Sequence, residues 1–184
     1  MQMSNLLFLD IETGGFNKVK DAVCSITLKC KDDMQTWYVK PYGKRYTKKS
    51  LEVHGITLEE LYTKGIEVKK VIREMNAFII YNSKDDGMFV GHNLHFDLSF
   101  LENFFDENNY NLYDGINYHF YDTMHLALYL RSIGKINPES LKLIDLYKML
   151  FDDGLEKDAH KSDIDVLMTE KVYYKLLEIE NGKK

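Results

Sequence analysis

The sequence is poor in the residues that mark several classes of protein. It holds two prolines and two cysteines in 184 residues, and its N-terminal apolar run, Leu6 to Leu9, is only four residues long. A secretory signal or a membrane span needs a much longer run, so we expect a cytoplasmic protein that does not enter a membrane. Cys24 and Cys30 lie too far apart for a C-x-x-C pair, and we interpret them as reduced structural thiols.

The chain also lacks linkers and repeats. No stretch rich in Ser, Gly or Pro interrupts it, and no segment is repeated or of low complexity. A length of 184 residues fits one domain with a sizeable core, so we expect residues 1–184 to form a single domain.

An excess of positive charge is missing as well. The net charge is −5, whereas a protein that grips duplex nucleic acid along a broad face is usually basic. Positive charge gathers only in residues 40–49, the basic segment, where five cations alternate with Tyr42 and Tyr46: Lys40, Lys44, Arg45, Lys48 and Lys49. A solvated loop and a local contact to phosphates are both compatible with this pattern.

Hydrophobic periodicity predicts an α/β fold with a mixed sheet. Strands are expected at 5–12, 22–30 and 34–40, then in two short runs, "GMFVGHN" up to Gly91 and "YHFYDT". Helices are expected to begin at the capping box of Thr57 and Glu60 and at Asn137-Pro138, and to span 66–81, 95–105, 123–131 and 162–179.

Two carboxylates end the first strand. Side chains alternate along a strand, so Asp10 and Glu12 share a face, ~7 Å apart along the backbone. Carboxylates this close repel each other unless one is protonated or a cation lies between them, and a divalent metal ion would relieve the repulsion. Two exposed acids at a strand terminus are the simpler alternative.

Further acids lie on helices that we expect to pack inward. Asp97 precedes Leu101 and Phe104 on one apolar stripe, and Asp165 lies at the edge of the stripe of the last helix. Helix capping for Asp97 and a favourable helix dipole for Asp165 are the structural alternatives. His160 precedes Asp165 by five residues on an expected loop, and an imidazole with a pKa of ~6.5 suits proton abstraction near neutrality.

Together these segments resemble a known family. "FLDIETGG", "VGHNLHFDLSFL" and "AHKSDIDV" resemble the three motifs of the DnaQ-like, DEDDh 3′→5′ exonucleases, and "EVHGIT", "YDTMHLA" and "LKLIDLY" resemble the segments between them. The resemblance covers about residues 5–170. Ser162 stands where the family commonly has Ala, and Asp163 is an additional acid that we expect to face solvent.

The resemblance implies a ribonuclease H-like exonuclease fold, with a central mixed five-stranded sheet flanked by helices. It implies that Asp10, Glu12, Asp97 and Asp165 hold two Mg²⁺ or Mn²⁺ ions, and that His160 takes the proton of the attacking water. An all-carboxylate set suits hard cations better than zinc. The product would be a nucleoside 5′-monophosphate.

The same resemblance suggests contacts to the substrate. The candidates are Thr13, Gly14, His54, Ile56, His92, Asn93 and Phe96, with Gly55 beside them, although Ile56 and Phe96 are equally well explained as core residues. The favoured substrate is a single-stranded 3′ end, with DNA preferred to RNA, cleaved alone or in proofreading beside a DNA polymerase. An RNA-directed exoribonuclease and a catalytically silent module that binds nucleic acid or a polymerase remain as alternatives.

Overall fold

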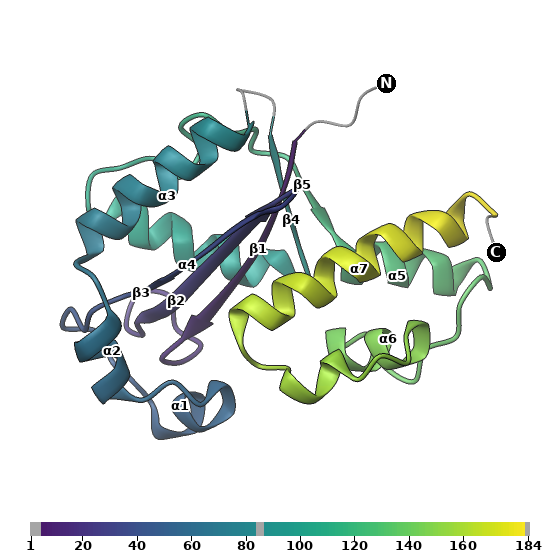
Figure 1. The fold of residues 1–184 in the computed structure, drawn as a ribbon, viewed down its shortest axis with the longest axis horizontal. Coiled ribbons are helices and arrows are strands. Elements are labelled where there is room, and N and C mark those ends of the chain that lie inside the picture. Colours follow the sequence, from purple (N-terminus) through teal and green to yellow (C-terminus); the bar gives the residue numbers. More distant parts are fainter. Residues whose placement is uncertain (1–4, 84–86, 183–184) are drawn as a thin grey trace.

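The computed structural model describes residues 5–83 and 87–182 and contains the expected five-stranded mixed sheet. The strands are β1 (Leu6–Thr13), β2 (Val23–Cys30), β3 (Asp33–Tyr38), β4 (Met88–Gly91) and β5 (Phe120–Asp122). Their order is β3-β2-β1-β4-β5; the pairs β3–β2 and β2–β1 are antiparallel, and the pairs β1–β4 and β4–β5 are parallel (Figure 1). The prediction of a mixed α/β sheet is confirmed.

The parallel strands place three polar segments at one edge of the sheet. Because β1, β4 and β5 run in the same direction, their carboxyl ends lie together. Glu12, His92 and Asp122 therefore come from distant parts of the chain to one edge, which is where ligands bind in open α/β sheets.

One face of the sheet is covered by α3 (Val68–Ser83) and α4 (Leu94–Asp106) (Figure 1). Both helices were predicted, and each extends by one or two residues beyond the expected limits at its C-terminal end. Their buried side chains pack on the odd-numbered residues of β1 to form the main core, which includes Leu7, Leu9, Ile11, Ile72, Met75, Ile79, Leu98 and Leu101. The contact between these two helices and this face of the sheet is therefore apolar.

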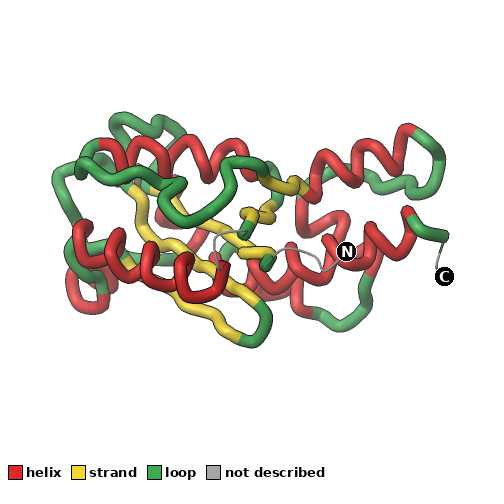
Figure 2. The backbone as a smooth tube through the Cα atoms, turned by 90° about the horizontal axis from the view of Figure 1, so that it is seen from above, coloured by secondary structure: helices red, strands yellow, loops and turns green. Residues whose placement is uncertain are grey.

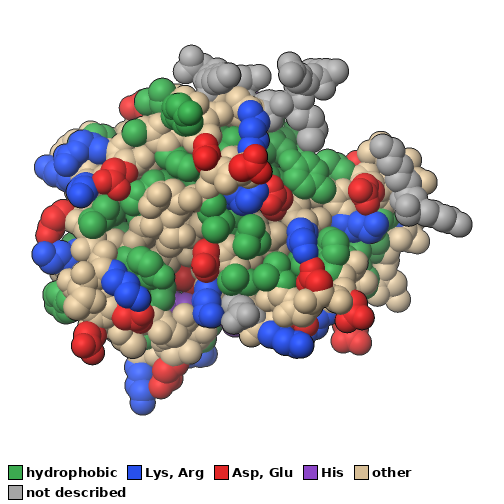
Figure 3. Space-filling model, in the orientation of Figure 1, with side chains coloured by type: hydrophobic (Ala, Val, Ile, Leu, Met, Phe, Trp, Pro, Cys, Tyr) green, Lys and Arg blue, Asp and Glu red, His purple; other side chains and the backbone are tan. Residues whose placement is uncertain are grey.

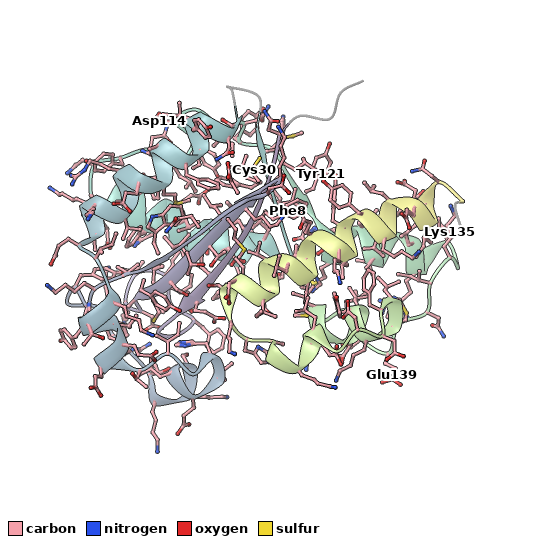
Figure 4. All side chains as sticks on the ribbon, in the orientation of Figure 1. Phe8, Cys30, Asp114, Tyr121, Lys135 and Glu139 are labelled. Carbon is pink, nitrogen blue, oxygen red and sulfur yellow. The ribbon has the colours of Figure 1, made fainter. Side chains whose placement is uncertain are left out.

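The opposite face is covered by α7 (Ser162–Glu180). Val166 and Tyr173 pack on Phe8 of β1, which Figure 4 labels between the sheet and this helix, and the rings of Phe8 and Tyr173 are 5.8 Å apart. The predicted stripe of α7 is only half of its buried surface. Met168, Val172 and Leu176 belong to that stripe and face a second cluster, whereas the contact of Val166 and Tyr173 with the sheet was not predicted. The helix therefore buries two sides, one on the sheet and one away from it.

The second cluster joins α7 to α5 (Thr123–Ser132) and α6 (Leu143–Leu150), which lie together beyond one edge of the sheet in both Figure 1 and Figure 2. The predicted helix start at Asn137-Pro138 is wrong. The chain stays non-helical up to Lys142, the N-cap of α6, while Ile136 and Leu141 pack against the cluster. The hydroxyl of Ser140 accepts the Lys142 N–H and bonds the Asp145 carboxylate, which favours the later start.

Short elements complete the fold. These are α1 (Lys48–His54), α2 (Leu58–Lys64) and a 3₁₀ turn, η1 (Leu155–Asp158). The capping box predicted for Thr57 and Glu60 is present at the start of α2. Cys24 and Cys30 are free and buried, as expected. Among the described residues, no helix is both long and apolar enough to cross a membrane.

Candidate active site

Three carboxylates converge at the carboxyl end of β1. Asp10 and Glu12 lie on the face of the sheet that α7 covers, and Asp165 reaches them from the first turn of that helix. One oxygen from each of the three carboxylates lies within 4.8 Å of the other two. Residues 10 and 165 are separated by most of the chain, so only the tertiary fold brings these groups together.

Asp165 also organises the loop before α7. Its Oδ1 accepts the backbone N–H of His160 at 3.2 Å, which ties the residue before the helix to the carboxylate inside it. The neighbouring acid, Asp163, is half-buried, outside the three-carboxylate group, and its Oδ1 accepts the N–H of Ile164 at 3.0 Å. The structure therefore separates the two acids of this turn.

Asp97 approaches from the other side of β1. It lies in the first turn of α4, is buried, and its Oδ1 accepts the backbone N–H of Ile11 at 3.1 Å. This long-range bond to β1 fixes the carboxylate between Asp10 and Glu12 along the strand. Asp97 is not the N-cap of α4, because Asn93 occupies that position.

The four acids share an environment that penalises negative charge. Burial, followed by the charges of Asp97, Asp165 and Glu12, raises the pKa of Asp10 well above its ordinary value. Burial is also the largest cause of the raised pKa of Glu12, about 9, of Asp97, about 8, and of Asp165, about 6. Without a cation, several of these groups stay protonated at neutral pH.

The donor set fits a hard divalent cation. It consists of carboxylate oxygens with no cysteine or histidine nitrogen in the group, and such oxygen ligands are those of Mg²⁺ and Mn²⁺. The raised pKa values indicate that the carboxylates lack a positive neighbour, and a bound cation would supply this positive charge. Of the acids in this group, Asp10, Glu12 and Asp165 would contact one ion together, and Asp97 is placed to serve the same centre from the α4 side.

His160 lies at the rim of this centre. Its side chain is exposed and its backbone has a φ of 67°, in the left-handed region that non-glycine residues seldom adopt. Together with Asp165, His92 and Asn93 it lines a pocket of about 540 Å³, whose walls also include apolar residues of α5, α6 and α7. The imidazole is thus next to a cluster carboxylate and open to solvent.

Two of the proposed substrate contacts, Thr13 and Gly14, lie at the end of β1. The Thr13 hydroxyl donates to the Gly15 carbonyl at 2.7 Å, and the backbone of Gly14 bonds Ala22 and Thr47. A Cβ on Gly14 would meet the Arg45 carbonyl oxygen at 2.5 Å, so packing against the basic segment already requires glycine here.

His54 is the last residue of α1, and Ile56 lies in the turn that follows. The Nδ1 of His54 accepts the backbone N–H of Ile56 at 3.1 Å, and burial lowers the pKa of His54. The imidazole is therefore held as a neutral group beside the Thr13 carbonyl, which partly offsets this lowering.

His92, Asn93 and Phe96 surround the start of α4. The Nδ1 of His92 lies 2.9 Å from the Thr123 hydroxyl, and burial lowers the pKa of His92. The backbone N–H of Asn93 donates to Asp122, and the Phe96 ring packs at 4.9 Å from Phe100. His92 and Phe96 thus have structural contacts of their own, while the Asn93 side chain is exposed.

Asp122 is a residue that sequence reasoning missed. Its carboxylate accepts the backbone N–H groups of Asn93, Leu94 and Met124 at 2.9–3.0 Å, and so caps the starts of α4 and α5 together. The signal was present, because an aspartate directly after a strand and before a helix is a preferred N-cap.

Phe16 was also missed. It follows Gly14-Gly15, its side chain is 81% exposed, and its ring lies 6.2 Å from that of Phe96 in an edge-to-face arrangement. An aromatic residue directly after the acid-bearing strand could have been noticed in the sequence. Its exposure, with Phe96 of α4 against it, makes a flat apolar surface available near the end of β1.

The basic segment is partly neutralised by acids from elsewhere in the chain. Lys40 pairs with Glu67, Lys44 with Glu107, Arg45 with Asp21 and Lys48 with Glu52. Lys49 makes no ion pair with any residue in the described ranges. On the face drawn in Figure 3, Lys and Arg side chains alternate with Asp and Glu, as the net charge of −5 suggests.

Comparison with known proteins agrees with this geometry. The chain matches the exonuclease family model, of the RNase T type, over residues 7–173. No curated protein matches the chain in sequence.

Solved structures of E. coli exonuclease I share the fold. The zinc-bound complex with single-stranded DNA superposes with a TM-score of 0.79 at 23% identity, covering 99% of this chain and 42% of that one. The complex with a dA16 oligonucleotide gives 0.78 at 21% identity, covering 98% and 42%, and the apo enzyme gives 0.77 at 22%, covering 96% and 42%. The chain thus spans about two fifths of the length of these proteins.

The family match includes the three segments that supply the carboxylates, and the sheet and its helices have the order of exonuclease I. The family consists of divalent-metal-dependent nucleases, which are hydrolases. The chain belongs to the exonuclease family, within the DnaQ-like branch of the ribonuclease H-like superfamily.

Proposed function

We propose that this chain is a metal-dependent 3′→5′ exonuclease that releases nucleoside 5′-monophosphates from single-stranded DNA. The observation that carries the proposal is the convergence of Asp10, Glu12 and Asp165 within 4.8 Å, with Asp97 bonded to the strand between the first two. Three half-buried acids and one buried acid this close together cost free energy unless a cation joins them. This cost in free energy is explained if the cation takes part in the reaction.

Two Mg²⁺ or Mn²⁺ ions are the proposed cofactors, held by Asp10, Glu12, Asp97 and Asp165. When bound, such ions polarise the scissile phosphate and stabilise the charge that develops on the attacking and leaving oxygens. The contribution of the protein is to hold its four carboxylates in place from β1, α4 and α7 before substrate arrives.

His160 is the proposed general base. Its imidazole is exposed at the rim of the centre, while its backbone N–H is held by Asp165. A ring nitrogen there accepts the proton of the water that attacks phosphorus.

The terminal nucleotide is proposed to lie over the end of β1. Phe16 offers an exposed ring for stacking, backed by Phe96, and Thr13, Gly14, His54 and Ile56 form the adjoining surface. His92 and Asn93 border the pocket beside Asp165. Stacking of a base on an aromatic side chain contributes ~1–3 kcal/mol and tolerates any sequence, which suits an exonuclease.

DNA is preferred to RNA as substrate because the superposing structures include exonuclease I bound to single-stranded DNA and to a dA16 oligonucleotide. Discrimination against RNA depends on contacts to the 2′-hydroxyl. No basic surface spreads over the face in Figure 3, so contacts to a strand are expected near the site.

The direct test is incubation of the protein with 3′-labelled and 5′-labelled single strands of DNA and RNA, with Mn²⁺ or with EDTA. We expect stepwise shortening from the 3′ end of DNA, release of 5′-monophosphates, and complete inhibition by EDTA. Preferred cleavage of RNA would reassign the substrate. Binding without cleavage in Mn²⁺ would indicate a silent binding module instead.

The role of His160 has a test of its own. His160→Ala should lower kcat by ~10²–10⁴-fold, the usual contribution of a general base, while Mn²⁺ binding is retained. His125→Ala, at an exposed histidine of α5, is the matched control and should leave turnover unchanged. Wild-type turnover in His160→Ala would reject the base assignment.

A further inference from the structure

A row of hydroxyl side chains on β2 runs beside the carboxylates. Ser25 and Thr27 are almost completely buried and point to the face of the sheet that α7 covers. In the antiparallel register of β1 and β2, Ser25 pairs with Glu12 and Thr27 pairs with Asp10. Each carboxylate of β1 therefore has a buried hydroxyl as its neighbour one strand away.

Ser162, the first residue of α7, joins this row. Its Oγ lies 2.8 Å from the Thr27 hydroxyl and 3.2 Å from the Ser25 hydroxyl, and its side chain is 4% exposed. Thr27 in turn lies 2.8 Å from the Thr36 hydroxyl of β3. The three hydroxyls of Ser25, Thr27 and Ser162, here called the hydroxyl clamp, connect the sheet to the beginning of a helix.

The position of this connection matters because of what α7 carries. Ser162 and Asp165 are three residues apart and so lie on neighbouring positions of one side of the helix. The N-cap of α7, Lys161, makes no side-chain capping bond. The hydroxyl clamp is thus a side-chain attachment of this helix start to β2, and the ion pair of Lys29 with Glu170 is a second attachment two turns later.

The hydroxyl clamp is a neutral hydrogen-bonded contact, so it fixes the start of α7 without adding charge beside the three carboxylates. It also fixes the His160 backbone indirectly, since that N–H is bound by Asp165.

We propose that the hydroxyl clamp holds the start of α7 against β2, and so keeps Asp165 at ligand distance from Asp10 and Glu12 before a metal ion binds. Ser162, Ser25 and Thr27 are positioning residues in this proposal, which rests on the proposed function, and none of them touches the reacting atoms. A site arranged in advance binds its ion more tightly, because binding does not have to order the ligands.

The test measures Mn²⁺ affinity by calorimetry rather than turnover alone. Ser162→Ala should weaken Mn²⁺ binding by ~10–100-fold, the usual effect of losing a group that orients a ligand. Ser83→Ala is the matched control, because Ser83 is equally buried and donates one hydrogen bond, to the Gly115 carbonyl, far from the carboxylates. It should leave Mn²⁺ affinity unchanged even if the protein becomes less stable.

A pair of variants at Thr27 separates hydrogen bonding from packing. Thr27→Val keeps the shape and removes the hydroxyl, so it should weaken Mn²⁺ binding, whereas Thr27→Ser keeps the hydroxyl and should retain it. The reverse order would show that packing matters instead and would overturn the proposal. Equal Mn²⁺ affinity in wild type and Ser162→Ala would overturn this inference alone, and a wild type that binds no Mn²⁺ would overturn the proposed function and the inference with it.

Discussion

The two faces of the sheet are built from the same strands but differ in chemistry. On the face toward α3 and α4, Leu7, Leu9 and Ile11 of β1 are buried among other apolar side chains. On the face toward α7, Phe8 is followed along the strand by Asp10 and Glu12, with Ser25 and Thr27 beside them on β2. The face toward α3 and α4 thus stabilises the fold, whereas holding the carboxylates close together on the face toward α7 costs part of that stability.

This contrast predicts opposite effects of truncating a side chain on the two faces. The largest effect on activity is expected from Asp10→Ala, which removes one of the three carboxylates that converge at the proposed metal centre. Turnover should fall at least as far as the ~10²–10⁴-fold expected for loss of the base. The metal-free protein should become more stable, because the variant removes a carboxyl whose charged form is penalised first by burial and then by its acidic neighbours. Activity assays and chemical denaturation in EDTA measure the two effects.

The control for this variant is Asp163→Ala, which removes an acid from the same region but outside the three-carboxylate group. Turnover within a few-fold of wild type is expected. If Asp10→Ala were active or less stable than wild type without metal, the functional view of this face would be wrong.

The apolar face should respond in the reverse way. Ile72 of α3 is completely buried in the main core, so Ile72→Ala should lower the free energy of unfolding by about 2–5 kcal/mol through lost burial and a cavity. The folded fraction should keep its Mn²⁺ affinity and its turnover, measured well below the melting temperature. A large loss of kcat at full folding would indicate that the two faces are coupled.

The dependence of folding stability on pH should also distinguish the two faces of the sheet. The pKa values of Glu12, about 9, Asp97, about 8, and Asp165, about 6, lie above those of the unfolded chain, near 4. The folded metal-free protein therefore binds more protons than the unfolded chain, so the stability present below pH ~4 is lost as pH rises through these values.

Divalent ions should reverse this dependence. Because a metal ion binds the ionised carboxylates, its affinity rises with pH, and Mg²⁺ should restore at pH 8 the stability that is lost in EDTA. Urea unfolding at pH 5, 7 and 8 with EDTA or Mg²⁺ checks the sign. The raised pKa values would be contradicted if the metal-free protein became more stable from pH 5 to pH 8 because of the cluster. A slope of stability against pH that Asp10→Ala flattens would identify the cluster as the cause.

The contrast between the two faces also explains which elements of the fold could be predicted from the sequence. Apolar periodicity was sufficient for β1, α3 and α4, since their residues face one uniform partner. It was incomplete for α7, because that helix packs on two partners and its stripe includes only one side. The start of α6 was placed too early because Asn137-Pro138 is a good local signal, and the burial of Leu141 against other helices outweighed it.

For the site, motif spacing identified Asp10, Glu12, Asp97 and Asp165, and the fold brings them to one centre, but their roles in catalysis remain predictions. The three-way capping by Asp122, the exposure of Phe16 and the partners of Ser162 depend on contacts between residues far apart in the chain. No local pattern specifies which distant hydroxyl or amide a side chain will meet.

The smallest predicted effect concerns the basic segment, where most charges already have partners. Lys49 is exposed, makes no ion pair with the described residues, and lies beside Phe16 in a pocket that Thr47 and Ser50 also line. If it contacts one phosphate of a longer strand, Lys49→Glu should reduce the slope of log affinity against log salt by at least ~0.7, with little change for a dinucleotide. Lys31→Glu, at the β2–β3 turn at the opposite end of the sheet, is the control and should keep the wild-type slope. Equal slopes in all three proteins would mean that Lys49 contacts no phosphate and that the basic segment is only a solvated loop.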